Sequence, residues 1–179
     1  MSKVRTFSRF FPNGHPKQGE PTFFVEKIYH SLAMQISYKL ICDLNPDKSP
    51  DILFTFWQKL LQEYHPKKLH TIRAGKHFKV GDYFSPRVWS DKPYSSKQII
   101  IAPDLQIKKV WDIEIEVGEK YWFFKLNGED ISNGREDFNI DDFTETLAKN
   151  DGLELCDFLN WFPKSFTGQI ICWHESVEY

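Results

Sequence analysis

The residues of this chain that are best suited to chemistry lie together in the segment 67–73, which reads KKLHTIR. It offers cationic donors, an imidazole and a hydroxyl within a few positions of one another. Exposed charges add little to the stability of a surface strand, so such a cluster needs another explanation. Lysine and arginine donate well to phosphate and to polarised carbonyl groups. The segment therefore predicts a small cationic ligand site, with an ordinary basic strand edge as the alternative.

Strand geometry sets a condition for such a site. In a straight strand the side chains of Thr71 and Arg73 share one face, while that of Lys68 points to the other face. The three side chains converge only if Lys68 lies in the loop before the strand, and Pro66 favours extended backbone there. His70 is either a hydrogen-bonding ligand contact or a packed histidine.

A known family carries a similar arrangement of residues. Two runs show it: Lys68-x-x-Thr71-x-Arg73, and then His77-Phe78-Lys79-x-Gly81-Asp82. They resemble the signature of the ASCH superfamily, a branch of the PUA-like barrels, although Pro66 stands where the family pattern has a glycine. The resemblance implies an α+β fold, a PUA-like mixed β-barrel with helices packed around it. We expect a single domain over 1–179, with a helical insertion at about 31–64.

The resemblance also implies a function. ASCH-type proteins suggest binding of RNA or of a modified nucleoside in a small cationic cleft. In this interpretation Arg73, His70 and Lys67 bind the ligand. A non-catalytic protein-interaction module, in which the cleft is vestigial, is an alternative.

Some relatives are amidohydrolases that act on acylated cytidine, which gives a second alternative. Their activity is assigned to a lysine, a threonine and a glutamate, and the matching positions here are Lys68, Thr71 and Asp151. A partly desolvated lysine near another cation loses its proton readily and can act as a base. It would activate the threonine hydroxyl, or a water, for attack on an amide carbonyl. Asp151 is one methylene shorter than the family's glutamate.

Composition limits the other possibilities. The chain has 179 residues, 41% of them hydrophobic, which suits one domain with a substantial core. A formal net charge of −2 argues against binding of extended duplex DNA and favours a small ligand. The His and Cys residues lack zinc-like spacing, and there is no phosphate-loop or dinucleotide glycine pattern, so no metal or cofactor is expected.

Localisation follows from two further features. Only 3 cysteines are present and none forms a C-x-x-C pair, which suits a reducing compartment. No apolar run approaches a membrane span of about 20 residues, and the first residues do not resemble a signal peptide. We therefore expect a cytoplasmic protein with no membrane partner; the sequence does not determine the oligomeric state.

The elements that position the cluster follow from periodicity and from turn residues. Helices are predicted at 22–34, 50–64, 140–149 and 155–162. Strands are predicted at 69–73, 83–89, 97–102, 111–117, 121–126 and 165–174. A break in the alternation at Lys109 predicts a bulge, and segment 35–48 has no clear pattern. We expect 69–126 and 166–175 to close into one barrel-like sheet, with Ile170–Trp173 central and buried.

Overall fold

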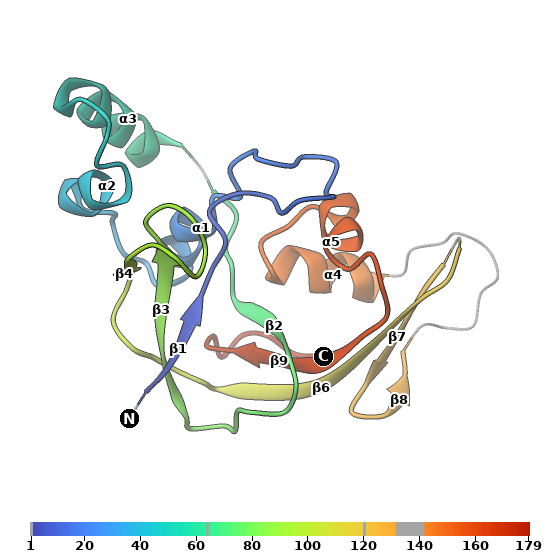
Figure 1. The fold of residues 1–179 in the computed structure, drawn as a ribbon. Helices are drawn as coiled ribbons and strands as arrows, with labels where there is room; N and C mark the ends of the chain where they lie inside the picture. The colour runs from blue at the N-terminus through green and yellow to red at the C-terminus, as the bar shows by residue number, and fades with distance from the viewer. Residues whose placement is uncertain (1, 64, 120, 132–141) are drawn as a thin grey trace.

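The computed structural model describes residues 2–63, 65–119, 121–131 and 142–179, and they form a mixed α+β fold (Figure 1). In chain order the elements are β1 (Lys3–Thr6), α1 (Phe24–Ser31), α2 (Tyr38–Leu44), α3 (Pro50–Gln62), β2 (His70–Ala74), β3 (Tyr83–Trp89), β4 (Gln98–Ile100), β5 (Leu105–Gln106), β6 (Lys109–Val117), β7 (Trp122–Leu126), β8 (Glu129–Asp130), α4 (Asp142–Asn150), α5 (Leu155–Trp161) and β9 (Phe166–Cys172).

The described strands form two sheets. In the first sheet β3 pairs with β1 in parallel and with β4 and β5 in antiparallel orientation. The second sheet is antiparallel in the order β2-β9-β6-β7-β8. Strand β9 is therefore central, as its wholly apolar run predicts, and Ile170, Ile171 and Cys172 are fully buried.

A short segment after β5 leads the chain from the first sheet into the second. The Ile107 amide donates to the Asp82 carbonyl at 2.8 Å, and the next amide, that of Lys108, donates to the Cys172 carbonyl at 2.8 Å. Strand β6 then pairs with β9 in unbroken register from Lys109 onward. The predicted bulge at Lys109 is therefore wrong, because the break in alternation marks the passage between sheets.

On the other side of the molecule the sheets are joined differently. Within the described residues no strand ladder joins β1 to β2, so the strands form two sheets rather than the one closed sheet that we expected. A side chain crosses this junction instead: Arg73 Nη2 on β2 donates to the Thr6 carbonyl at the end of β1, at 2.8 Å.

Helices α4 and α5 lie over one face of the second sheet (Figure 1). Phe158 of α5 stacks at 6.3 Å from Phe124 of β7, and Leu147 of α4 is fully buried. Their apolar spacing predicts this packing. Within the described parts of the chain, every helix is too short or too polar to span a bilayer.

Helices α2 and α3 pack on each other at one corner of the molecule, within the segment interpreted as an insertion (Figure 1). Helix α2 arises in the segment that lacked a pattern, and the Ser37 side chain caps it by accepting from the Leu40 amide at 3.2 Å. In α3, Leu53 and Leu60 are buried, and Trp57 Nε1 donates to the Ile36 carbonyl at 2.7 Å.

Candidate functional site

Lys68 lies in the loop just before β2, where convergence with the strand residues requires it. Its side chain is 1% exposed, and Nζ lies 2.8 Å from Asp151 Oδ1. Nζ also donates to the Asp151 backbone carbonyl at 2.5 Å and lies 4.1 Å from the centre of the Phe24 ring. The lysine and the aspartate that the sequence singled out are therefore in direct contact.

The end of α4 holds Asp151 in place. The Leu153 amide donates to the Ala148 carbonyl at 3.0 Å, which closes the helix with a left-handed residue, Gly152 at φ +75°. A Cβ on Gly152 would lie 3.1 Å from Lys68 Cβ, so glycine also permits the close approach. The Leu69 amide donates to the Asn150 carbonyl at 2.8 Å and ties the start of β2 to the same helix end.

Burial controls the electrostatics of this pair. Desolvation lowers the pKa of Lys68 to about 8, and the neighbouring Asp151 carboxylate only partly offsets that effect. The Arg73 charge lowers the pKa of Lys68 further. Desolvation also raises the pKa of Asp151, against the attraction of Lys68. Lys68 is consequently an amine that can release its proton near neutral pH.

Thr71 and Arg73 point to the same face of β2. Thr71 is buried, and its hydroxyl makes no hydrogen bond to another described residue. The Arg73 guanidinium lies 5.2 Å from the Phe7 ring centre, and Lys68 Nζ lies 6.0 Å from the same ring. Phe7 is thus a common neighbour of the two cations, while no hydrogen bond in the described structure joins Lys68 to Thr71.

His70 and Lys67 are placed differently from the other predicted site residues. His70 is fully buried on the opposite face of β2 from Thr71, and its ring lies 5.8 Å from that of Tyr179. His70 Nδ1 lies 3.5 Å from Asp151 Oδ1, and burial holds the pKa of His70 well below its ordinary value, so the imidazole is neutral. This environment fits the packed-histidine alternative. Lys67 is exposed and makes no contact with the cluster among the described residues.

The structure also gathers arginines that the sequence did not single out. We call the following group, which surrounds β1 and its junction with β2, the arginine seam: Arg5, Arg9, Arg73 and Arg87. Arg5 lies on β1, with its guanidinium 4.3 Å from the Phe78 ring centre. Arg87 of β3 pairs in register with Thr6 of β1. Within the described residues, no arginine forms an ion pair with a carboxylate.

Two donors of the seam are buried and are not satisfied by the described residues. Arg73 Nε and Arg5 Nε are buried and have no hydrogen-bond partner. Burial lowers the pKa of Arg73 to about 10 and also lowers the pKa of Arg5, in both cases mainly by desolvation. An unpaired buried donor is costly, so the seam favours an added acceptor. In the sequence, the feature that points to the arginine seam is the short, aromatic and basic segment 4–11.

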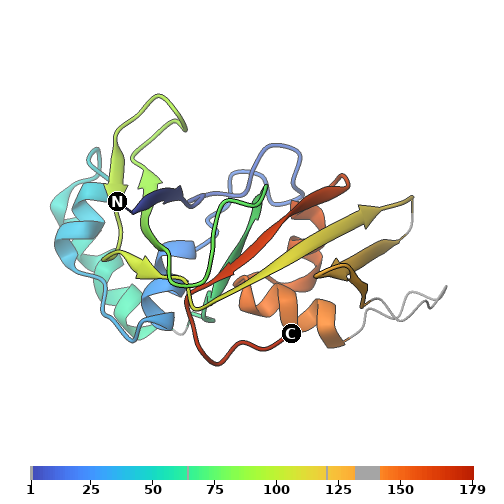
Figure 2. The ribbon, with the colours of Figure 1, turned by 90° about the horizontal axis from the view of Figure 1, so that it is seen from below.

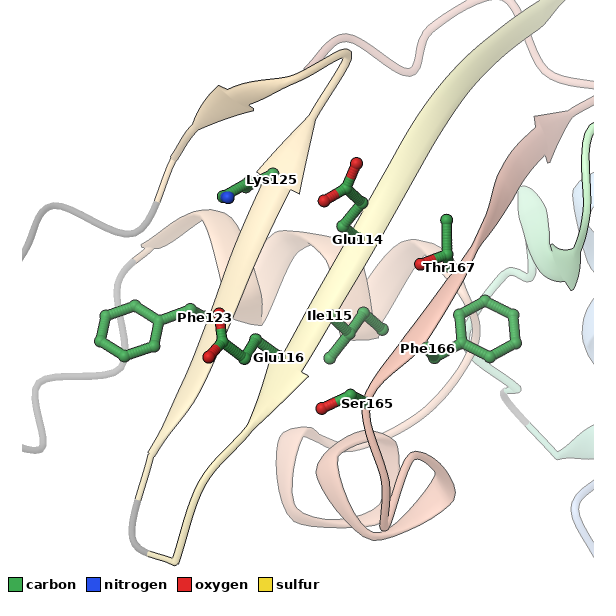
Figure 3. A pocket seen from close by; sticks show the side chains of 8 residues that line it. All are labelled: Glu114, Ile115, Glu116, Phe123, Lys125, Ser165, Phe166 and Thr167. Atoms are coloured by element: carbon green, nitrogen blue, oxygen red, sulfur yellow. The ribbon is translucent and has the colours of Figure 1, made fainter.

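A hollow of about 240 Å³ lies elsewhere, on the second sheet (Figure 3). Its lining residues come from β6, β7 and β9 and their ends: Glu114, Ile115, Glu116, Phe123, Lys125, Ser165, Phe166 and Thr167. None of the predicted site residues lines it. Its two carboxylates, Glu114 and Glu116, disfavour an anionic ligand.

Comparison of the chain with protein-family models, with curated proteins and with solved structures gave no match. The described residues also contain no group of three or more His, Cys, Asp or Glu side chains arranged to hold a metal ion.

Proposed function

We propose that this protein is an ASCH-type protein that binds RNA or a modified nucleoside at the arginine seam. The single observation that carries the proposal is the concentration around β1 of arginines that have no carboxylate partner among the described residues, in a chain whose formal net charge is −2. Arginine recognises phosphate and carbonyl acceptors with a planar fork of donors. Ion pairs with carboxylates would occupy these forks, and the described arginines form none.

The fold is proposed to be a PUA-like barrel opened along the β1–β2 junction. Two features support this. The Ile107–Lys108 segment joins the sheets on one side, and the Arg73 hydrogen bond to Thr6 links them on the other. Since that second link is one side chain rather than a ladder, a ligand has only a few contacts to replace there.

Binding by the seam is tested by titrating nucleosides and short single-stranded RNA into wild-type protein and two variants. Arg73→Gln removes the charge at the seam, and Lys125→Gln removes a cation from the acidic hollow as a matched control. We expect Arg73→Gln to weaken binding about tenfold or more, because charge-assisted hydrogen bonds are strong. Lys125→Gln should leave binding unchanged. Equal affinity in all three proteins, or no binding by wild type, would refute the proposal.

Amide hydrolysis on an acylated cytidine-type nucleoside is a second candidate function. The observation that favours it is a lysine of pKa about 8, with a threonine hydroxyl on the next strand that is free of hydrogen bonds to described residues. Neutral Lys68 would accept the Thr71 proton as the hydroxyl oxygen attacks the amide carbonyl. Lys68 would then return that proton to the departing cytidine amine as the amide C–N bond breaks, and water would hydrolyse the acyl-threonine. Because Lys68 is 1% exposed, hydrolysis requires the ligand to open the site. Acylated cytidines incubated with wild type should release free cytidine, and Lys68→Ala should abolish the release; no release by wild type excludes this function.

A further inference from the structure

We infer that the ligand of the arginine seam is a nucleotide, whose phosphate binds Arg73 and Arg5 and whose base stacks on Tyr94. This inference rests on the proposed function and makes its ligand specific. A free nucleotide and a nucleotide within an RNA strand present the same phosphate next to the same planar base, and the experiment below distinguishes the two.

Tyr94 is displayed in a way that packing does not explain. Its side chain is 90% exposed, although tyrosine is a large and mainly apolar residue. Its backbone has φ +63°, in the left-handed region that bulky residues rarely adopt. The Tyr94 ring lies 5.7 Å from the Trp89 ring, which supports it from one side. The result is an aromatic surface that is open to a stacking partner.

The loop that carries Tyr94 lies at the seam. It follows β3, and the Ser90 amide closes it by donating to the Lys97 carbonyl at 2.9 Å. Arg9 Nη1 donates to the Ser90 carbonyl at 3.3 Å, which fixes the loop to the chain after β1. Figure 2 shows β1 beside β3, with this loop extending past the end of β3. The loop begins three residues after Arg87, which pairs with Thr6, the residue whose carbonyl accepts from Arg73.

The guanidinium groups of Arg5 and Arg73 indicate that the ligand carries a phosphate. Arg5 and Arg73 lie near enough that the charge of Arg5 lowers the pKa of Arg73. Two like charges repel, and both groups also hold a buried Nε without a partner. Arg73 Nη1 makes no hydrogen bond to another described residue. A phosphate bound between them would relieve the repulsion and accept from several donors. Asp151, the carboxylate that acts on Arg73, is already paired with Lys68.

The register of β1 and β3 relates the Arg73 guanidinium to the loop that carries Tyr94. Thr6, whose carbonyl holds Arg73, pairs in register with Arg87, two positions before Trp89. The contact of Arg73 with Thr6 thus lies toward the end of β3 from which the Tyr94 loop extends. A ligand with a planar base and a nearby anion would use both features: the base would stack on Tyr94, and the anion would bind the arginines. A free phosphate would use the arginines and leave Tyr94 without a role.

The experiment is a calorimetric titration with four kinds of probe: the ribonucleoside 5′-monophosphates, the matching nucleosides, inorganic phosphate, and a short single-stranded RNA. Wild type is compared with Tyr94→Ala and with Arg5→Gln. Tyr83→Ala is the matched control, because Tyr83 is 50% exposed at the other end of β3. Arg5→Lys keeps the charge of Arg5 and tests whether the planar fork is needed. Thermal unfolding of each variant verifies that it is folded.

We expect nucleotides to bind more tightly than nucleosides. Tyr94→Ala should weaken nucleotide binding about tenfold, as for loss of one stacked base, while Tyr83→Ala has no effect. Arg5→Gln should remove the preference for nucleotide over nucleoside. Binding of the RNA alone, with the same response to the variants, assigns the nucleotide to a strand; binding of the monophosphates assigns it to the free form.

Two results would overturn the inference and leave the proposed function intact. One is equal affinity for nucleosides and nucleotides in wild type. The other is unchanged nucleotide binding in Tyr94→Ala. If inorganic phosphate binds as tightly as any nucleotide, the inference and the proposed function both fail. If none of the probes binds, the proposed function fails together with the inference.

Discussion

Replacing Asp151 by asparagine tests the electrostatics of the buried lysine, because the change removes a charge but keeps the size of the side chain and the backbone carbonyl. In wild type, Lys68 Nζ lies 2.8 Å from Asp151 Oδ1, and the two side chains are 1% and 8% exposed. Loss of one partner from a buried ion pair costs about 3–5 kcal/mol when the other charge remains. Lys68 can avoid that cost, because it can release its proton and become neutral.

The pKa of Lys68 determines how much stability Asp151→Asn removes. At pH 7, removing a proton from a group whose pKa is about 8 costs about one pKa unit, on the order of 1 kcal/mol. A neutral amine beside an amide leaves no uncompensated buried charge. We therefore expect Asp151→Asn to lower the free energy of unfolding at pH 7 by about 1–2 kcal/mol, well below the usual cost of a broken buried pair.

The direction in which the free energy of unfolding changes with pH follows from the pKa of Lys68 in the folded state. The folded-state pKa of Lys68 lies below its ordinary value of 10.5, so between these two values the unfolded state binds more protons. Stability then rises with pH, by up to about 1.4 kcal/mol per unit. In wild type the rise begins near pH 8; without the Asp151 charge it begins at a lower pH. The deficit of the variant should therefore shrink between pH 7 and pH 9.

Urea unfolding followed by circular dichroism at these two pH values measures the effect. Lys68→Met combined with Asp151→Asn is the control; because it carries neither titrating group, its stability should not show the rise of Asp151→Asn between pH 7 and pH 9. A deficit of about 4 kcal/mol that is the same at pH 7 and pH 9 would refute the reasoning, because it would mean that Lys68 stays charged when its partner is removed.

Two further predictions concern packing. Trp57→Ala should lower the free energy of unfolding by about 2–4 kcal/mol, because it removes a large, partly buried ring and the hydrogen bond to the Ile36 carbonyl; a loss below about 1 kcal/mol in urea unfolding would mean that α3 packs loosely on α2. Gly152→Ala should destabilise more than Gly128→Ala: both glycines have positive φ, but a Cβ at position 152 meets Lys68 at 3.1 Å and one at position 128 meets nothing within 4 Å. Equal effects of the two glycine variants in thermal unfolding would show that the approach to Lys68 is not constrained.

Local patterns predicted the elements around the site well. Strand β3 matches its predicted range, and β2 begins one residue later than predicted, at His70. The argument that Lys68 must precede the strand needed only the alternation of side chains along a strand and the effect of Pro66. The alternation of polar and apolar residues also breaks where the chain passes from one sheet to the other. For this reason the prediction of a bulge at Lys109, at the start of β6, is wrong.

The arginine seam could not be predicted, because it depends on pairing between distant segments. Arg5 is close to Arg73 because Arg73 of β2 donates to the carbonyl of Thr6, the residue after Arg5 on β1, and this contact leaves no turn signal in the sequence. The exposure of Tyr94 could not be predicted from the sequence for a different reason. Its loop reads as an ordinary polar connection, and the positive φ that exposes the ring is a property of the folded backbone.

The central claim, that a nucleoside-type ligand binds at the arginine seam, is tested most directly by the arginine side-chain signals in a ¹H–¹⁵N spectrum. Signals of the Arg73 and Arg5 Nε–H groups, assigned with Arg73→Lys and Arg5→Lys, are followed during a titration with ribonucleoside monophosphates and nucleosides. The account predicts saturable shifts of the Arg73 signal, because its unpaired Nε–H lies in the proposed site. An Arg73 signal that stays unchanged, while backbone signals around Glu114 and Phe123 shift, would contradict it.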